Sequence, residues 1–145
     1  MRGAVQASIV VHAEPDRVWD VIADFDAYPQ WQPDIREAET LETDGDGWGT
    51  KARFVVDARF MHAEVVLAYT YTDTTMTWAL VEGEGVRRND GTYTVEPGED
   101  GATLVSYELE IEPAVPVPAL MRRKAARRIV EAALRDMKLR AEDAG

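Results

Sequence analysis

Hydrophobic and polar side chains alternate along most of the chain. From residue 105 to residue 112, valine, tyrosine, leucine and isoleucine alternate with serine and glutamate. This period of two places the apolar side chains on one face of a strand and the polar ones on the other. Alternation or an enrichment in β-branched residues predicts seven strands in all, over residues 4–12, 35–43, 49–58, 62–72, 76–82, 88–96 and 102–112.

The connections between the last six of these segments are short. They contain turn-forming residues, as in DGDG (44–47), DTT (73–75) and GEG (83–85). Because such turns join antiparallel neighbours, we expect these six strands to follow one another across the sheet as a meander.

Helical periodicity appears in two places outside the strands. Pro15 stands at the start of a segment in which Val18, Ile22 and Phe25 recur at helical spacing, and this predicts a short helix that ends near Asp24. Two further prolines then restrict residues 27–32 to one more short helical turn.

The longest predicted helix spans residues 119–142. It follows the proline-rich segment PAVPVP, contains no glycine or proline, and is rich in alanine, arginine and leucine. At a rise of 1.5 Å per residue it is about 36 Å long, which is enough to cross a whole sheet. One stripe of this helix is apolar, and it consists of Ala126, Ile129, Val130, Ala133 and Met137.

These elements predict an α+β fold that forms a single domain over residues 1–145. A wide antiparallel sheet of seven strands twists, so we expect it to curve around the long C-terminal helix that covers its dry face. The two short helices lie between the first and second strands. Two curved surfaces of this kind do not close perfectly, and we expect a space to remain between the sheet and the helix.

Composition restricts the class of protein. The chain of 145 residues has a net charge of −11 and no cysteine, which excludes disulfides and thiolate metal sites. Its apolar runs are shorter than the roughly 20 residues of a membrane span, and its beginning lacks the apolar core of a signal peptide. We therefore expect a cytoplasmic globular protein. Strong acidity argues against nucleic acid as a partner, because phosphate contacts dominate affinity there.

Charge is distributed unevenly along the chain. Residues 122–140 contain 8 basic and 2 acidic side chains, whereas the residues before them are strongly acidic. Two interpretations of the basic final helix remain open. One is a transient contact with a membrane surface or another anion. The other is a solvated helix face that complements acidic strands beside it.

No motif for metal binding or covalent catalysis is present. The two histidines, His12 and His62, lie far apart and outside any metal-binding frame, and no GxSxG elbow or glycine-rich phosphate loop occurs. We predict no catalytic residue, no metal and no cofactor. Acids that cluster around the first helix could serve as general bases, although surface positions and helix ends explain them as well; they are Asp20, Asp24, Asp26 and Asp34.

Aromatic side chains gather on the dry face and after the first helix. As a group they suit an apolar pocket that also orients a polar group of its ligand, because tyrosine and tryptophan add O–H and N–H groups to apolar walls. A simple place in the core is the alternative for each single residue. We expect Tyr28, Trp31, the hairpin near residues 59–61 and the start of the last helix to form the rim. The predicted ligand-binding set is Phe25, Tyr28, Trp31, Phe54, Val56, Leu67, Tyr69, Tyr71, Trp78, Leu80, Tyr93, Tyr107, Leu109, Ile129, Ala133 and Met137.

The order of several loose motifs resembles a known superfamily. The opening HAEPDRVWDVIADFDAYPQWQPDI is followed by FVVDA, YTY, TWALVEG, NDGTYTV and GATLVSYELEI, and then by IEPAVPVP and a final helix rich in Lys, Arg and Ala. In this order the motifs are similar to the START-like, helix-grip (SRPBCC) superfamily over nearly the whole chain. The chain most resembles the polyketide cyclase/dehydrase and lipid-transport branch, near the coenzyme Q-binding proteins.

The resemblance implies a sheet that grips the C-terminal helix around an apolar cavity. It implies binding or transport of a small hydrophobic ligand, such as a lipid, a quinone or an aromatic polyketide-like metabolite. The alternative function is that of a polyketide aromatase/cyclase that acts in the same cavity. In the cyclising relatives, an interior arginine helps to orient the substrate. Alternation places Arg53 and Glu64 on the outer face, which favours the binding protein. An inward position of either residue, or of His62, would favour the enzyme.

Overall fold

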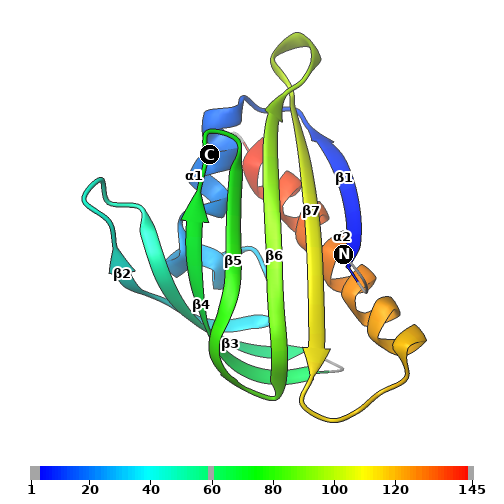
Figure 1. Cartoon of the computed structure of the whole chain (residues 1–145). Coiled ribbons are helices and arrows are strands. Elements are labelled where there is room, and N and C mark those ends of the chain that lie inside the picture. The colour runs from blue at the N-terminus through cyan, green and yellow to red at the C-terminus, as the bar shows by residue number, and fades with distance from the viewer. Residues whose placement is uncertain (1–3, 59–60, 144–145) are drawn as a thin grey trace.

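The chain folds into one curved antiparallel sheet and a long helix, as Figure 1 shows. The computed structural model describes residues 4–58 and 61–143. Within these residues, seven strands lie in the order β1-β7-β6-β5-β4-β3-β2. The elements along the chain are β1 (Val5–Val11), α1 (Pro15–Ile22), the 3-10 helix η1 (Phe25–Gln30), β2 (Ile35–Thr43), β3 (Gly49–Ala58), β4 (Met61–Tyr71), β5 (Thr75–Glu84), β6 (Val86–Pro97), the 3-10 helix η2 (Glu99–Gly101), β7 (Thr103–Pro113) and α2 (Ala119–Glu142).

The predicted α+β helix-grip architecture is confirmed. Strands β2 to β7 form the expected meander, and β1 joins the sheet by antiparallel pairing with β7. Two short helices separate β1 from β2, and α2 begins and ends at the predicted residues. These elements have the strongest sequence patterns, because their apolar positions repeat without interruption.

The differences from the prediction lie at the ends of elements. Strand β5 extends to Glu84 and β6 begins at Val86, so the predicted three-residue turn shrinks to Gly85. Gly85 has a φ of 86°, and a Cβ atom at this position would lie 2.3 Å from the carbonyl oxygen of His62. Only glycine fits this turn. The helix α1 ends at Ile22, earlier than predicted, and η1 then brings Phe25 into the core.

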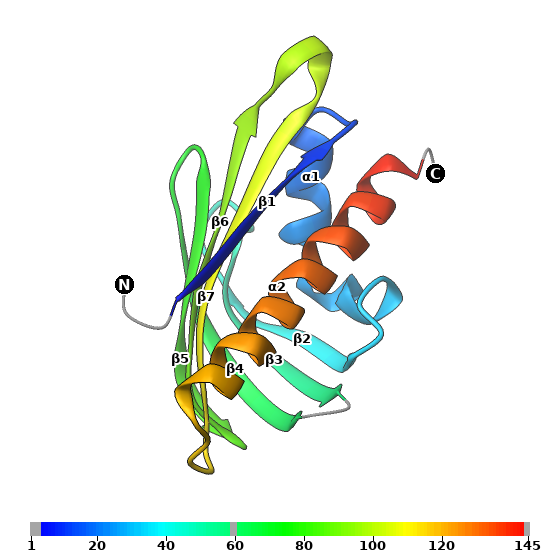
Figure 2. The same cartoon turned by 90° about the vertical axis from the view of Figure 1, so that its right-hand side faces the viewer.

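The helix α2 crosses the concave face of the sheet, which Figure 2 shows in profile. It packs chiefly on β1, β7 and α1, and in the described residues it has no comparable packing against β3 to β6. The buried side chains of α2 form one stripe, which consists of Ala126, Val130, Ala133, Leu134, Met137 and Ala141. Since the sheet twists away from a straight helix, the flank of α2 that faces the middle strands stays separated from them.

A group of aromatic side chains joins α1 to the hairpin between β2 and β3. Trp19 of α1 meets Trp48 edge-on with ring centroids 5.8 Å apart, and both rings lie beside Tyr71. The hydroxyl of Tyr71 donates a hydrogen bond to the carbonyl of Gly49. This group therefore fixes α1 against the sheet. The aromatic set chosen from the sequence did not include Trp48, whose signal is a tryptophan directly after the turn DGDG.

Candidate functional site

A cavity of about 720 Å³ lies between the sheet and α2. Inward-facing side chains of β3 to β7 form one wall, and the flank of α2 forms the other. At one end the lining comes from the start of β2, the ends of the β3–β4 and β5–β6 hairpins, and the segment between β7 and α2. Val115 in that segment is 69% exposed, which marks this end as the mouth. The volume lies within the range of small-molecule sites and exceeds the voids of a packed core.

Most residues of the predicted ligand-binding set line this cavity. They come from η1, from five strands and from α2, and the fold brings them together around one space. They are Tyr28, Phe54, Val56, Leu67, Tyr69, Trp78, Tyr93, Tyr107, Leu109, Ile129 and Ala133. Contact of these side chains with a ligand stays a prediction.

Five residues of the set do not line the cavity, and their predicted place on its wall is wrong. Phe25 lies behind the wall and packs on Tyr69 with ring centroids 4.3 Å apart, and Trp31 is buried behind Tyr28 at 4.9 Å. The others are Tyr71, which bonds to the hairpin between β2 and β3, Met137, which is fully buried, and Leu80, which packs against the edge of the core. Periodicity gives the face of a strand or helix, but not whether a side chain reaches the cavity or stops in the layer behind it.

The rim also differs from the prediction. Tyr28 and the start of α2 lie at the cavity, whereas Trp31 does not. The tip of the predicted hairpin at residues 59–60 falls outside the described residues.

Sequence reasoning missed most polar residues of the lining. Several belong to connections near the mouth, where no periodicity exists. Others, at positions 122, 128 and 136, lie along the flank of α2 beside its apolar stripe. The polar residues of the lining are Gln32, Asp34, His62, Asn89, Arg122, Arg128 and Asp136, of which only Asp34 and His62 are named in the sequence analysis.

Trp78 is the centre of the aromatic wall. Its ring lies 5.4 Å from that of Tyr107, 5.6 Å from that of Tyr93 and 5.9 Å from that of Tyr69. The indole N–H donates a hydrogen bond to Oδ1 of Asn89 at 3.1 Å. Packing on three sides and one polar bond hold the indole in a single orientation.

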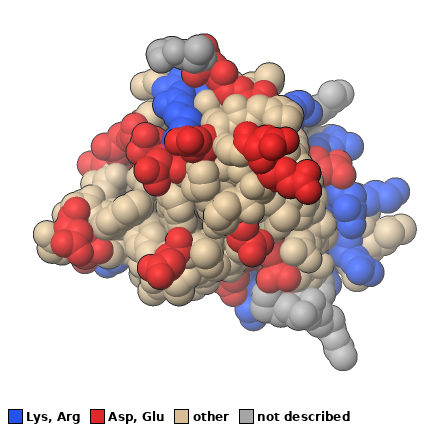
Figure 3. Space-filling model, turned by 90° about the horizontal axis from the view of Figure 1, so that it is seen from above, with Lys and Arg blue, Asp and Glu red and all other residues tan. Residues whose placement is uncertain are grey.

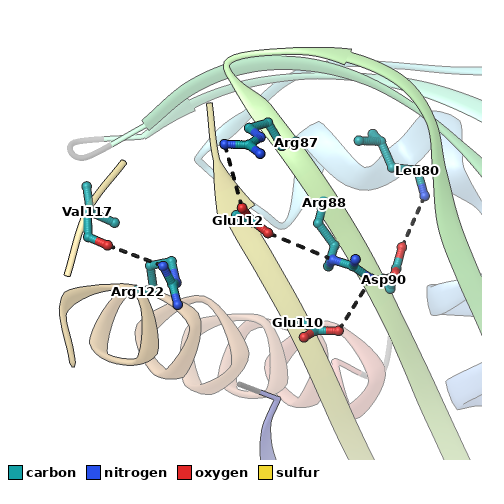
Figure 4. A network of polar contacts seen from close by, with 8 residues as sticks. All are labelled: Leu80, Arg87, Arg88, Asp90, Glu110, Glu112, Val117 and Arg122. Carbon is teal, nitrogen blue, oxygen red and sulfur yellow. Dashed lines mark hydrogen bonds and ion pairs between the residues drawn. The ribbon is translucent and has the colours of Figure 1, made fainter. Parts of the chain in front are cut away.

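Between Trp78 and the mouth, side-chain hydrogen bonds take the place of backbone hydrogen bonds between β5 and β6. The pairing of β5 with β6 ends at Trp78 and Gly91. Beyond this point the backbone N–H of Leu80 donates to Oδ1 of Asp90 at 3.4 Å, and Arg88 bonds to the other oxygen of Asp90 at 3.1 Å, as Figure 4 shows. The carboxylate thus joins two strands that have separated, which leaves room for the cavity beneath them.

Three tyrosine hydroxyls point into this space without a protein partner. Tyr28 donates to the carbonyl of Ile22 at 2.5 Å. Among the described residues, none accepts from or donates to the hydroxyls of Tyr69, Tyr93 and Tyr107. None of these three hydroxyl oxygens is completely buried, and all three tyrosines line the cavity. The hydroxyls therefore face the cavity.

Burial keeps these tyrosines protonated. It is the main cause that raises the pKa of Tyr69 and of Tyr93 well above 10.0, and neighbouring tyrosines add to it. Burial also raises the pKa of Tyr107. The cavity therefore offers three neutral hydroxyl donors within an apolar wall.

The charged residues named in the sequence analysis lie on the outside or at the mouth. Arg53 forms ion pairs with Glu64 at 3.0 Å and with Glu37 at 3.5 Å, so both Arg53 and Glu64 face outward as alternation predicts. His62 lies at the mouth, where its Nδ1 is 2.7 Å from Asp57 and its side chain is 79% exposed.

Two other features are absent from the residues that the structure describes. No three His, Asp or Glu side chains in residues 4–58 and 61–143 are grouped so that they could hold a metal ion. No helix in the same residues combines the length and the apolar character that crossing a membrane requires.

Comparison with known proteins places this cavity in a family. The model of the family described as polyketide cyclase / dehydrase and lipid transport matches residues 2–142. The chain belongs to this family. The resemblance to this family seen in the sequence is thereby confirmed.

Solved structures show the same fold. A START superfamily protein from Mycobacterium smegmatis is 24% identical, with a TM-score of 0.91 over 98% of this chain and 99% of that chain. The Zhui aromatase/cyclase from Streptomyces sp. R1128 is 20% identical, with a TM-score of 0.73 over 96% and 93%. A STAR-related lipid transfer protein from Xanthomonas axonopodis is 19% identical, with a TM-score of 0.70 over 97% and 86%.

Proposed function

We propose that the protein binds and carries a small hydrophobic molecule in the cavity between the sheet and α2. The observation that supports this function best is the space of about 720 Å³, whose largely apolar wall includes six Phe, Tyr or Trp side chains. A ligand that buries about 200–300 Å² of apolar surface there gains roughly 5–8 kcal/mol before the cost of association. No catalytic group is needed for useful affinity.

The hydroxyls of Tyr69, Tyr93 and Tyr107 narrow the class of ligand. A buried donor without a partner is unfavourable, and a guest with carbonyl or hydroxyl oxygens supplies the missing acceptors. The surrounding rings suit a flat molecule. A quinone or an aromatic polyketide-like metabolite therefore fits this wall better than a plain acyl chain. The nearness to coenzyme Q-binding proteins, predicted from the sequence, agrees with such a ligand.

The residues that the sequence offers for an aromatase/cyclase do not meet inside the cavity, although Arg122, Arg128 and Asp136 of α2 line it. The candidate for an interior arginine, Arg53, lies on the outer face and is neutralised by glutamates. His62 and Asp57 do form a pair, but His62 is in contact with water at the mouth. Neither group supplies an enclosed acid or base for proton transfer.

A matched pair of compounds tests the proposed ligand class. We expect calorimetric titration to show that 2,3-dimethyl-1,4-naphthoquinone binds more tightly than 2,3-dimethylnaphthalene, which has the same ring skeleton without oxygens. In the variant Tyr69→Phe/Tyr93→Phe/Tyr107→Phe, the ratio of the affinity for the quinone to the affinity for the hydrocarbon falls by at least about tenfold, because each lost hydrogen bond is worth about 1 kcal/mol. The hydrocarbon keeps its affinity.

Tyr71→Phe is the control for this experiment. It removes a hydroxyl that bonds to Gly49 outside the cavity, so both compounds should bind to it as they bind to the unaltered protein. Failure of both compounds to bind would contradict the carrier function. Equal binding of the two would reject only the oxygen-bearing class.

A further inference from the structure

The beginning of α2 and the segment before it expose hydrophobic side chains beside the mouth. Val115, Leu120 and Met121 are 69%, 65% and 57% exposed. Val115 also lines the cavity. A protein that needed only to cover its core would not leave three large apolar side chains in water within seven residues.

Basic side chains surround these exposed residues. Residues 113–130 contain five basic side chains and no acid, whereas the remainder of the chain contains 11 basic and 27 acidic side chains. In Figure 3 a group of Lys and Arg side chains occupies the side of the molecule where α2 begins, and Asp and Glu are spread over much of the rest of that view. The side of the mouth that α2 forms is thus basic, in a protein that is acidic overall.

Three of these basic side chains do not complement acidic strands. In the part of the chain that the structure describes, no ion pair involves Arg123, Lys124 or Arg127. Elsewhere arginines do pair, as Arg53 does with its glutamates. The interpretation of the basic helix as a face that neutralises neighbouring strands therefore does not hold for these three residues.

The position of these charges is also unfavourable for the helix itself. The N-terminal end of a helix favours acids, yet the first turn of α2 has none, and Pro118 offers no side-chain cap. Three basic residues follow directly at positions 122–124. Basic residues at this end are unfavourable for the helix, which indicates that the segment has a role other than helix stability.

Hydrophobic and basic side chains share one face of α2. At 100° per residue, Leu120, Lys124 and Arg127 lie within an arc of about 60°, and Met121 lies about 60° beyond it. All four are exposed. An apolar patch set among cations matches the interface of an anionic bilayer, where the apolar side chains enter the headgroup region and the cations meet lipid phosphates.

We propose that this docking surface, made of Val115, Leu120, Met121, Arg123, Lys124 and Arg127, binds reversibly to anionic membranes and sets the mouth of the cavity against the lipid. The acidic remainder of the protein is repelled by the same membrane, so only this end can approach it. Membrane contact does not depend on the ligand. Its use in exchanging ligand with the bilayer rests on the proposed function.

Vesicle flotation of the full chain tests the proposal. We expect the protein to float at low ionic strength with phosphatidylcholine vesicles that contain about 30% phosphatidylglycerol. It should detach from these vesicles at about 0.5 M salt, and it should not bind to vesicles of pure phosphatidylcholine. Lys124→Glu/Arg127→Glu weakens this binding at least about tenfold. Leu120→Gln/Met121→Gln also weakens it, because the apolar part of the surface is lost.

Lys51→Glu/Arg135→Glu is the matched control, since it changes the net charge by the same amount at positions outside the mouth, near the start of β3 and in the second half of α2. This control should bind vesicles far better than Lys124→Glu/Arg127→Glu. Equal losses in the two variants, or no salt-sensitive binding of the unaltered protein, would overturn the proposal and leave an acidic protein as the partner of this surface. Lys124 and Arg127 do not line the cavity, so binding of a hydrophobic compound in vesicle-free solution should survive their replacement.

Discussion

Raising the pH above 10 is expected to unfold the protein over about two pH units. Burial is the main cause that raises the pKa of Tyr28, Tyr69, Tyr93 and Tyr107 in the folded chain. In the unfolded chain these groups ionise near 10. Above that pH the unfolded state binds fewer protons than the folded state, so stability falls as the pH rises. Four such groups lower the free energy of unfolding by up to about 5 kcal/mol per pH unit.

Tyrosinate absorbance and circular dichroism, followed together through an alkaline titration, measure this effect. We expect both signals to change in one cooperative transition. In Tyr107→Phe the slope of stability against pH should be smaller by about 1.4 kcal/mol per pH unit, because one titrating group is gone. Ionisation of all tyrosines near pH 10 in a protein that keeps its native circular dichroism would contradict the burial of these hydroxyls.

Replacing Gly91 with alanine is expected to lower the free energy of unfolding by about 2–4 kcal/mol. Gly91 pairs with Trp78 across β5 and β6. A Cβ atom at this glycine would lie 2.3 Å from Cζ2 of Trp78 and 3.0 Å from the carbonyl oxygen of Glu108. The indole covers the glycine, so it would have to leave its place on the cavity wall and lose its bond to Asn89.

Thermal or urea unfolding measures the loss in Gly91→Ala, and tryptophan fluorescence reports the displaced indole. Gly45→Ala is the control, since a Cβ atom there meets nothing within 4 Å. Its stability should stay within about 0.5 kcal/mol of the unaltered protein. A Gly91→Ala protein as stable as this control would show that Trp78 does not rest on the glycine.

The sequence predicts the framework of this fold because its elements are long and their apolar positions repeat. The alternation in β7 and the uninterrupted helix α2 each fix a face, and the need to cover the dry face of the sheet fixes their arrangement. The one-residue turn at Gly85 depends instead on a positive φ and on the nearby backbone of His62. Neither feature appears in a pattern of polarity.

The sequence predicts most apolar residues of the candidate site but few of its polar residues. Tyr107 belongs to a strand whose alternation is unbroken, so it is placed on the inner face from sequence alone. Trp31 also looks like a wall residue, but it lies behind Tyr28, and this depth is set by the 3-10 helix η1, which carries Tyr28 and ends directly before Trp31. Asn89 enters the lining only because β5 and β6 separate beyond Trp78, an event that depends on tertiary packing.

The most direct test of the carrier function is fluorescence titration with the apolar probe N-phenyl-1-naphthylamine. The unaltered protein should bind the probe saturably, and Ala125→Trp/Ala132→Trp should bind it at least about tenfold more weakly, because both alanines line the cavity and the new indoles occupy it. Ala79→Trp, at an exposed position on β5, should behave like the unaltered protein. If the filled variant melts at the same temperature and binds the probe with unchanged affinity, the space between the sheet and α2 is not where the ligand binds.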